Sequence, residues 1–285
     1  MQTINENAFG KVMLAELGNG LEQLIIEHKA FNARVSLYGG QVLAWQPEGE
    51  EEVFWLSETS LFEQGKAIRG GIPLCWPWFG PYKDGGNHGF ARQVNWQFEL
   101  GEITEEHCQL TLMWEGENQH PLWPYKAKVE QKLVFGKTFY QALKVSNSSD
   151  KPFEFNGALH SYFNVSSPDN VTVPALNNVP FYCKLKDADN QQDSLTNIVG
   201  PLDRVYKTGA AMEIIDSGLA RTIALDVEKV SNWVLWNPGK ETAENMADIH
   251  AGGEDEYICL EAANTEWISV EAGAEYSFSQ HIAIR

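Results

Sequence analysis

Lysine and arginine are scarce in this chain, and arginine is the scarcer of these two residue types. Lysine and arginine total 21 against 39 aspartates and glutamates, which gives a formal net charge of −18. A surface of this sign repels nucleic-acid phosphates and anionic lipid headgroups, so we expect no nucleic-acid partner and no membrane partner. Because salt screens charges over about 8 Å, a local pocket can still attract a phosphorylated ligand. Such a pocket must use some of the six arginines: Arg34, Arg69, Arg92, Arg204, Arg221 and Arg285.

Cysteine is also sparse, and long apolar runs are missing. The four cysteines form no C-x-x-C pair, which argues against a zinc site or a disulfide framework and predicts free, buried thiols. The first ten residues, MQTINENAFG, lack the features of a secretory signal, and no run approaches the length of a membrane span. We therefore predict a cytoplasmic protein. The motifs G-x-G-x-x-G and H-E-x-x-H do not occur, so we expect neither a cofactor nor a metal.

Alternation of apolar and polar residues with a period of two runs from one end of the chain to the other. In VNWQFEL, residues Val94, Trp96, Phe98 and Leu100 share one face, as in a half-buried antiparallel strand. Similar stretches recur about every ten residues between turn signals, which predicts an all-β sandwich or barrel. Only two short helices are expected, at residues 57–65, capped by Ser57, and at 240–249. No internal repeat or linker is evident, so we predict a single domain over residues 1–285 and a monomer.

One long irregular stretch, residues 68–92, interrupts the strand pattern. It reads IRGGIPLCWPWFGPYKDGGNHGFAR and holds two of the six arginines, Arg69 and Arg92. A loop of this length is usually functional, and guanidinium groups bind phosphate or carboxylate through paired donors. The alternative is that both arginines pair with acidic side chains at the surface.

Two strand-like stretches carry titratable side chains. In FNGALHSYFNV, alternation places His160 opposite the core face; the alternative is a purely structural histidine. In YICLEAANTEW, Glu261 has Cys259 and Ala263 on its own face, where partial burial would raise its pKa and suit a general base. The alternative is a glutamate on an exposed sheet face.

Aspartate and tryptophan give weaker signals. Asp203 follows a proline-containing turn and has an ordinary turn role as its alternative. Four tryptophans are expected in the core, although one or two could offer a face to a sugar ring: Trp76, Trp78, Trp233 and Trp236.

Taken together and in order, these motifs resemble the hexose-6-phosphate mutarotases of the aldose 1-epimerase family. The resemblance rests on IRGGIPLCWPWFG, HGFAR, LHSYF, LDRVY, NWVLWNP and CLEAAN, which span residues 68–264. It implies a galactose-mutarotase-like fold, a large two-sheet β supersandwich with a sugar-binding concave face. It also implies an isomerase that interconverts the α and β anomers of a sugar phosphate, with glucose 6-phosphate the expected substrate.

The resemblance further implies a role for each matching residue. His160 would be the general acid and Glu261 the general base. Arg69 and Arg92 would hold the phosphate. Asn87 and His88 would lie at the mouth of the same loop, and Asp203 would bind sugar hydroxyls. Ring opening needs one acid and one base, which agrees with the expected lack of cofactor and metal.

Three alternatives remain open at this stage. The protein could be a mutarotase of free aldoses, in which Arg69 and Arg92 are structural. It could be a non-catalytic carbohydrate-binding or sensing protein, although this would not need both His160 and Glu261. Glycoside cleavage usually uses two carboxylates, and only Glu261 stands out.

Overall fold

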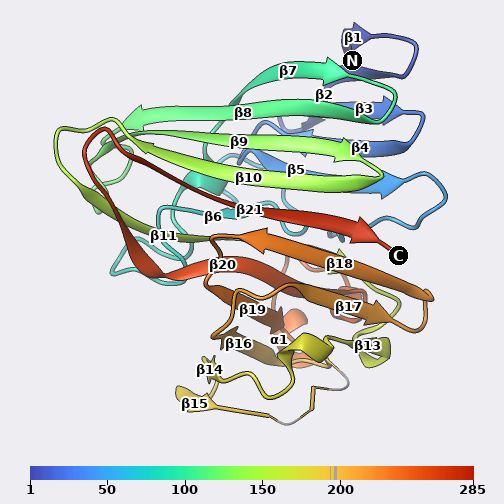
Figure 1. The fold of residues 1–285 in the computed structure, drawn as a ribbon, viewed down its shortest axis with the longest axis vertical. Coiled ribbons are helices and arrows are strands. Elements are labelled where there is room, and N and C mark those ends of the chain that lie inside the picture. The colour runs from blue at the N-terminus through green and yellow to red at the C-terminus, as the bar shows by residue number, and fades with distance from the viewer. Residues whose placement is uncertain (193, 196–197) are drawn as a thin grey trace.

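Three antiparallel β-sheets make up most of the molecule, one more than the two-sheet sandwich that the resemblance implied (Figure 1). The structure is a computed structural model and describes residues 1–192, 194–195 and 198–285. The N-terminal sheet has the order β1-β2-β3-β4-β5. Its strands are β1 (Gln2–Glu6), β2 (Gly10–Gly18), β3 (Leu21–His28), β4 (Phe31–Ser36) and β5 (Gln41–Pro47).

A second sheet, here called the central sheet, crosses the front of the molecule in Figure 1. Its order is β13-β17-β18-β21-β10-β9-β8-β7. Its strands are β7 (Gln97–Ile103), β8 (His107–Glu117), β9 (Lys126–Gly136), β10 (Thr138–Asn147), β13 (Val171–Thr172), β17 (Met212–Asp216), β18 (Arg221–Glu228) and β21 (Glu275–Ile284).

The third sheet, here called the site sheet, carries the candidate functional residues. Its order is β15-β14-β16-β19-β20-β11-β6, and β12 pairs with β20 beside β11. Its strands are β6 (Leu74–Cys75), β11 (Phe153–Leu159), β12 (Tyr162–Asn164), β14 (Phe181–Cys183), β15 (Ala188–Asn190), β16 (Leu202–Tyr206), β19 (Asn232–Asn237) and β20 (Tyr257–Val270).

The helices are short, and one of the two predicted ones is wrong. Residues 57–65 form turns because the Ser57 hydroxyl accepts from the backbone N–H of Thr59 and the Ser57 carbonyl accepts from that of Ser60. Serine side chains that bond locally in this way compete with helix formation. The second prediction is confirmed only as one turn, α1 (Lys240–Ala243). Single 3₁₀ turns occur at Ala91–Gln93 (η1), Pro168–Asn170 (η2), Pro174–Leu176 (η3) and Gly253–Asp255 (η4).

Strand alternation is confirmed, and with it the all-β fold class. In the stretch that includes β7, Trp96 is buried and Val94, Phe98 and Leu100 are half-buried, while the intervening residues are exposed. One continuous apolar cluster contains buried residues of all three sheets. All four cysteines are buried and free, as predicted.

A chain of buried glutamines joins the three sheets through hydrogen bonds. Gln280 of β21 donates to Gln141 of β10 at 2.9 Å, and Gln141 donates to Gln131 of β9 at 2.8 Å. Gln131 donates to the carbonyl of Gly40, which precedes β5, at 2.6 Å. At the other end Gln280 donates to the hydroxyl of Ser161, between β11 and β12, at 3.2 Å. The chain therefore links the site sheet to the N-terminal sheet through the central sheet.

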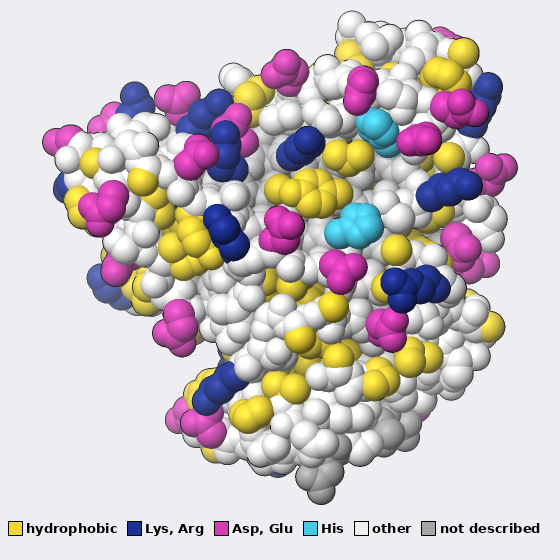
Figure 2. All heavy atoms as spheres, in the orientation of Figure 1, with side chains coloured by type: hydrophobic (Ala, Val, Ile, Leu, Met, Phe, Trp, Pro, Cys, Tyr) yellow, Lys and Arg dark blue, Asp and Glu magenta, His cyan; other side chains and the backbone are white. Residues whose placement is uncertain are grey.

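Charged side chains on the face shown in Figure 2 are mixed in sign. Acidic groups lie among lysines and arginines over its upper and left parts, while the lower part carries fewer charges. Among the described residues, no helix is long and apolar enough to cross a membrane.

Candidate active site

His160 and Glu261 converge from two neighbouring strands of the site sheet. His160 directly follows β11, and its backbone N–H donates to the carbonyl of Pro73 at 3.0 Å. Glu261 lies in the middle of β20, opposite Val234 of β19. The Nε2 atom of His160 is 3.5 Å from Oε1 of Glu261. Antiparallel pairing of β11 with β20 thus brings together two side chains that are a hundred positions apart in the sequence.

Both side chains are almost completely buried, and both line a cavity of about 320 Å³. This volume lies in the range of sites for small molecules, about 300–1,000 Å³. Two polar atoms of the pair have no hydrogen-bond partner among the described residues, namely Nδ1 of His160 and Oε2 of Glu261. Every residue that the sequence analysis assigned to the site lines this cavity: Arg69, Asn87, His88, Arg92, His160, Asp203 and Glu261.

Burial displaces the pKa of both groups toward their neutral forms. It raises the pKa of the Glu261 carboxyl group to about 8, and the charge of Asp203 acts in the same direction. It holds the pKa of His160 well below its ordinary value, as do the nearby His88, Arg92 and Arg69. At neutral pH the free site therefore holds one proton on Glu261 and a neutral imidazole. Glu261 is buried, so the alternative of a glutamate on an exposed sheet face does not hold.

The ring of His160 is fixed by aromatic packing. It stacks on Tyr162 at 4.8 Å between centroids with 8° between the planes, and Trp236 meets it edge-on at 6.3 Å. Trp236 lines the cavity and is half-buried, whereas Trp76, Trp78 and Trp233 are buried. Of the four tryptophans considered from the sequence, Trp236 is thus the one that faces the site.

The loop between β6 and η1 forms one wall of the cavity and holds His88. The backbone N–H of His88 donates to the carbonyl of Gly80 at 2.9 Å, and the N–H of Gly80 donates to Nδ1 of His88 at 3.1 Å. Nδ1 is thus the acceptor, so the proton of the neutral ring is on Nε2. Gly89 makes this turn possible, because its φ is +63° and an added Cβ would lie 2.0 Å from the carbonyl oxygen of Trp76.

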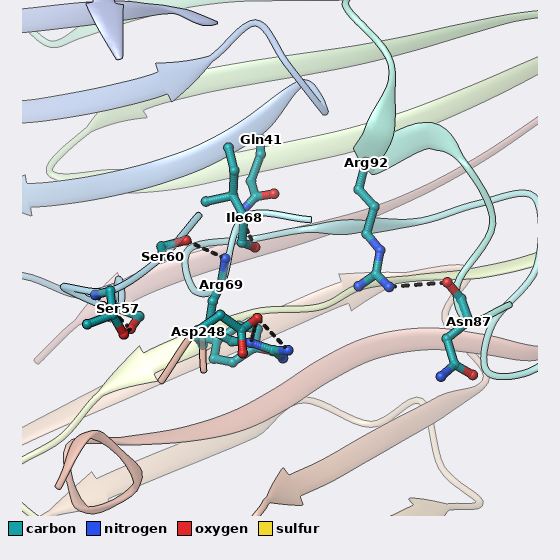
Figure 3. A network of polar contacts seen from close by, with 10 residues as sticks. Gln41, Ser57, Ser60, Ile68, Arg69, Asn87, Arg92 and Asp248 are labelled. Carbon is teal, nitrogen blue, oxygen red and sulfur yellow. Dashed lines mark hydrogen bonds and ion pairs between the residues drawn. The ribbon is translucent and has the colours of Figure 1, made fainter. Parts of the chain in front are cut away.

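The two arginines of the long loop have different surroundings (Figure 3). Arg69 donates from Nε to Asp248 at 3.0 Å and from Nη1 to the hydroxyl of Tyr162 at 2.9 Å, and its Nη2 is 2.9 Å from the same Asp248 oxygen. Arg92 reaches from η1 toward Asn87 and donates from Nη2 to its backbone carbonyl at 3.1 Å. The alternative of pairing with a carboxylate therefore holds for Arg69, while the structure shows no such pair for Arg92 within the described residues.

Sequence reasoning missed Lys184, which also lines the cavity. It follows β14 directly, and its Nζ lies 3.4 Å from Oδ1 of Asp203 in β16 and 4.4 Å from the centre of the Phe79 ring. Its sequence context, CKLKDAD, contains nothing that separates this lysine from the exposed Lys186. Asp248 was missed for the same reason, since its contact with Arg69 joins segments 179 residues apart.

Metal binding has no support in the part of the chain that the structure describes. No group of three or more His, Cys, Asp and Glu side chains in these residues is arranged to hold a metal ion.

Comparison with known proteins agrees with this architecture. A sequence profile described as aldose 1-epimerase matches residues 22–283. An Escherichia coli K12 protein named "Putative glucose-6-phosphate 1-epimerase" is 34% identical over 274 residues, which are 93% of this chain and 92% of the relative. A protein of the same name from Cenchrus ciliaris is 29% identical and covers 92% and 84% of the two chains.

Solved structures show the same fold. A Salmonella typhimurium protein described as a "putative mutarotase" superposes with a TM-score of 0.89 at 30% identity, covering 99% of this chain and 96% of that one. A galactose mutarotase-like protein from Lactobacillus casei, only 14% identical, superposes with a TM-score of 0.71 over 92% and 100% of the two chains. The galactose-mutarotase-like fold predicted from the sequence is confirmed, and the chain belongs to the aldose 1-epimerase family.

Proposed function

We propose that this protein interconverts the α and β anomers of a hexose 6-phosphate, with glucose 6-phosphate the expected substrate. The observation that carries the proposal is the buried pair His160–Glu261, 3.5 Å apart, in a cavity that is also lined by three cations. The names of the relatives in Escherichia coli and Cenchrus ciliaris support the same substrate. His160 and Glu261 are the proposed catalytic residues, and Arg69, Asn87, His88, Arg92 and Asp203 the proposed substrate-binding residues.

Ring opening moves two protons. The Glu261 carboxylate takes the proton of the C1 hydroxyl, and the His160 imidazolium gives a proton to the ring oxygen as the C1–O5 bond breaks. The products are an open-chain aldehyde, a neutral imidazole and a protonated carboxyl group. After rotation about the C1–C2 bond, the O5 hydroxyl attacks the other face of C1. His160 takes the O5 proton back and Glu261 protonates O1, so the reaction balances without any other reactant.

The free protein favours the proton distribution of the open-chain stage. Burial places the shared proton on Glu261 and leaves His160 neutral. A closed sugar therefore reacts after this proton has moved from Glu261 to His160. The negative charge of the bound substrate's phosphate group offsets the cavity cations that disfavour the His160 imidazolium, which stabilises the charged form of the pair. Positioned acid and base groups typically contribute about 10²- to 10⁴-fold each to the rate.

The proposal is tested by saturation-transfer NMR between the anomeric protons of α- and β-glucose 6-phosphate with catalytic amounts of protein. We expect exchange well above the spontaneous rate, and its loss in His160→Asn and in Glu261→Gln. Glucose measured in the same way separates a sugar-phosphate mutarotase from a free-aldose mutarotase. Spontaneous rates with the wild-type protein for both sugars would refute the proposal and favour a non-catalytic binding protein. Near-normal rates in either variant would refute the catalytic assignment.

We further propose that the protein works as a monomer in the cytoplasm. The four cysteines are free and buried, which agrees with a reducing compartment. Sedimentation at micromolar concentration tests the oligomeric state, and a dimer would contradict it.

A further inference from the structure

Tyr162 lies between His160 and Arg69 but is not among the residues that line the cavity. It is the first residue of β12, and its side chain is buried, with 1% exposed. Its backbone N–H donates to the carbonyl of Gly71 at 2.9 Å, and its own carbonyl accepts from the N–H of Trp55 at 3.0 Å. The backbone of Tyr162 is thus fixed from both sides, which defines where its ring can lie.

His160 lacks the hydrogen bonds that usually orient a catalytic histidine. Its Nδ1 atom has no partner within the described residues, and its Nε2 atom lies 3.5 Å from Glu261, beyond the usual range of a hydrogen bond. A histidine that transfers protons is commonly oriented by a group bonded to its second nitrogen. The orientation of this imidazole therefore has to come from the side chains that pack against it.

Among the described residues, three aromatic rings contact the imidazole, and Tyr162 is the nearest of them. Its centroid is 4.8 Å away with 8° between the planes, whereas His88 and Trp236 meet the imidazole edge-on at 5.7 and 6.3 Å. A parallel neighbour restricts rotation of the imidazole, because a rotated ring would collide with the tyrosine face. A cation over an aromatic face is also attracted to it, most strongly where water is excluded. The stack therefore favours the imidazolium that ring opening requires.

The ring of Tyr162 is itself held at its hydroxyl end. Arg69 donates from Nη1 to this hydroxyl at 2.9 Å, and Asp248 holds Arg69 through Nε at 3.0 Å and Nη2 at 2.9 Å. Burial raises the pKa of Tyr162, so the hydroxyl is neutral. Trp55 and Tyr257 pack against the same ring at 5.9 and 5.2 Å between centroids. A series of contacts thus runs from Asp248 through Arg69 and Tyr162 to the imidazole.

We propose that Tyr162 is a positioning residue, whose ring keeps the His160 imidazole turned toward Glu261 and the substrate. Arg69 and Asp248 keep this ring in place through its hydroxyl. The inference rests on the proposed function, since it concerns His160 as a proton donor to the sugar. Because Tyr162 acts on the proton donor and not on the substrate, its loss should lower kcat much more than it raises KM.

Tyr206 offers a matched control in the same sheet. It lies in β16, is 1% exposed, and packs on Phe181 at 5.0 Å between centroids. Its hydroxyl also accepts from an arginine, Arg204, at 3.3 Å. It is not among the residues that line the cavity. Substitutions at Tyr206 and at Tyr162 therefore remove similar packing and a similar hydrogen bond, but only those at Tyr162 should change the rate.

The test measures kcat and KM for glucose 6-phosphate by anomer exchange at several substrate concentrations. Tyr162→Leu removes the ring and should lower kcat about 100-fold, the loss expected when a catalytic group is displaced by about 1 Å, with KM changed by less than about threefold. Tyr162→Phe keeps the stack and loses only the bond to Arg69, so kcat should fall about three- to tenfold, the effect of one hydrogen bond. Tyr206→Leu and Tyr206→Phe should leave kcat unchanged.

Proton NMR of the histidine rings gives a second reading that does not depend on activity. Ring protons that lie over an aromatic face resonate upfield, and the signals of His160 are identified by their absence in His160→Asn. The upfield shift should persist in Tyr162→Phe and be lost in Tyr162→Leu. Both Tyr206 variants should retain it.

Three results would overturn the inference. One is an equal loss of kcat in Tyr162→Leu and Tyr206→Leu, and another is a Tyr162→Leu variant whose KM rises while its kcat stays that of wild type. If Tyr162→Leu does not fold, Tyr162→Phe decides, and a wild-type kcat in that variant is the third. If wild type exchanges no anomers at all, the proposed function fails, while the upfield shift of His160 still decides whether Tyr162 orients this ring.

Discussion

Burial of His160 and Glu261 disfavours the charged form of each side chain, because it removes the water that would stabilise the charge. In the proposed mechanism the pair functions with one shared proton, because opening and closing of the ring each pass one proton in and one out. The number of protons on the pair, more than their position, therefore decides whether the free protein is active. The activity of the free protein should therefore be limited at high pH by loss of the proton from Glu261, and at low pH by uptake of a second proton on His160.

The first prediction is a basic limb in the pH profile. The raised pKa of Glu261, about 8, means that the shared proton is lost above this pH. kcat/KM reports the free protein, so it should be constant from about pH 6.5 to 8 and then fall about tenfold per pH unit. His160 takes up a second proton only well below its ordinary pKa, so no acid limb is expected in this range.

The measurement is anomer exchange of glucose 6-phosphate between pH 6.5 and 10. The hydroxide-catalysed background must be measured without protein and subtracted. A kcat/KM that stays constant beyond pH 9 would contradict the loss of an essential proton from Glu261 near pH 8.

The second prediction concerns stability. The folded-state pKa of Glu261 lies above the ordinary value of 4.5, so the folded protein binds its proton more tightly than the unfolded chain does. The associated stability is fully present below about pH 4.5 and is lost as the pH rises through 8, by about 1.4 kcal/mol per pH unit. Glu261→Gln removes this loss. The variant should therefore be more stable than wild type at pH 8 and nearly equal to it at pH 4.5.

Thermal unfolding at several pH values checks this prediction. Glu266→Gln serves as the control, because Glu266 lies on the same strand but is exposed. Its melting temperature should follow that of wild type at every pH. A Glu261→Gln melting temperature that does the same would mean that the carboxyl group is not destabilised by burial.

Some residues of the site could be predicted from the sequence and others could not. His160 and Glu261 were recognisable because alternation placed each of them on a defined strand face within a recognisable motif. Lys184 and Asp248 carried no such signal, since their roles depend on contacts between distant segments. The ion pair of Arg69 could not be predicted either, because its partner Asp248 lies 179 residues away.

At the scale of elements, the glutamine chain links the end of β11, next to His160, to the other sheets. Ser161, the residue after His160, receives a hydrogen bond from Gln280, and the next two links pass through Gln141 to Gln131. All of these side chains are completely buried. Buried amides that satisfy one another fix the register of neighbouring elements, and removal of one leaves its partners unsatisfied.

The third prediction is that Gln141→Leu destabilises the protein by roughly 2–6 kcal/mol. The change leaves an acceptor on Gln131 and a donor on Gln280 without their partner, at about 1–3 kcal/mol for each orphaned group. Gln97→Leu is the matched control, because Gln97 is an exposed strand residue of the same sheet. Its effect should stay within about 0.5 kcal/mol. Urea unfolding measures both variants, and equal midpoints would contradict a stabilising role for the chain.

Strands were more predictable than helices for a physical reason. A half-buried strand repeats its environment every two residues, so the pattern is visible in the sequence. The helix expected at 57–65 rested on one N-cap residue, and Ser57 uses its polar groups in a local turn instead. Strand order was not predictable, because it depends on which strands pair across long separations, such as β10 with β21.

At the scale of the whole molecule, the net charge of −18 repels anions, whereas the cations that line the cavity attract them. Three cations line the cavity, and two of them are paired with Asp248 and Asp203. With Glu261 protonated, one positive charge remains uncompensated at Arg92. This local excess is what allows an acidic protein to accept a phosphate group, because the remote surface charges are screened at physiological salt.

The last prediction concerns the domain organisation, for which we propose one cooperative unit over residues 1–285. The apolar core contains Val12 and Leu24 of the N-terminal sheet, Phe139 of the central sheet and Ile258 of the site sheet in one cluster. The glutamine chain crosses the same three layers. Because the three sheets share one apolar core, no sheet can unfold without exposing core residues of the other two. Far-ultraviolet circular dichroism and tryptophan fluorescence should therefore report one coincident unfolding transition in urea. Two separated transitions, with the N-terminal sheet melting first, would show that the chain consists of two domains and that the shared core is too weak to couple them.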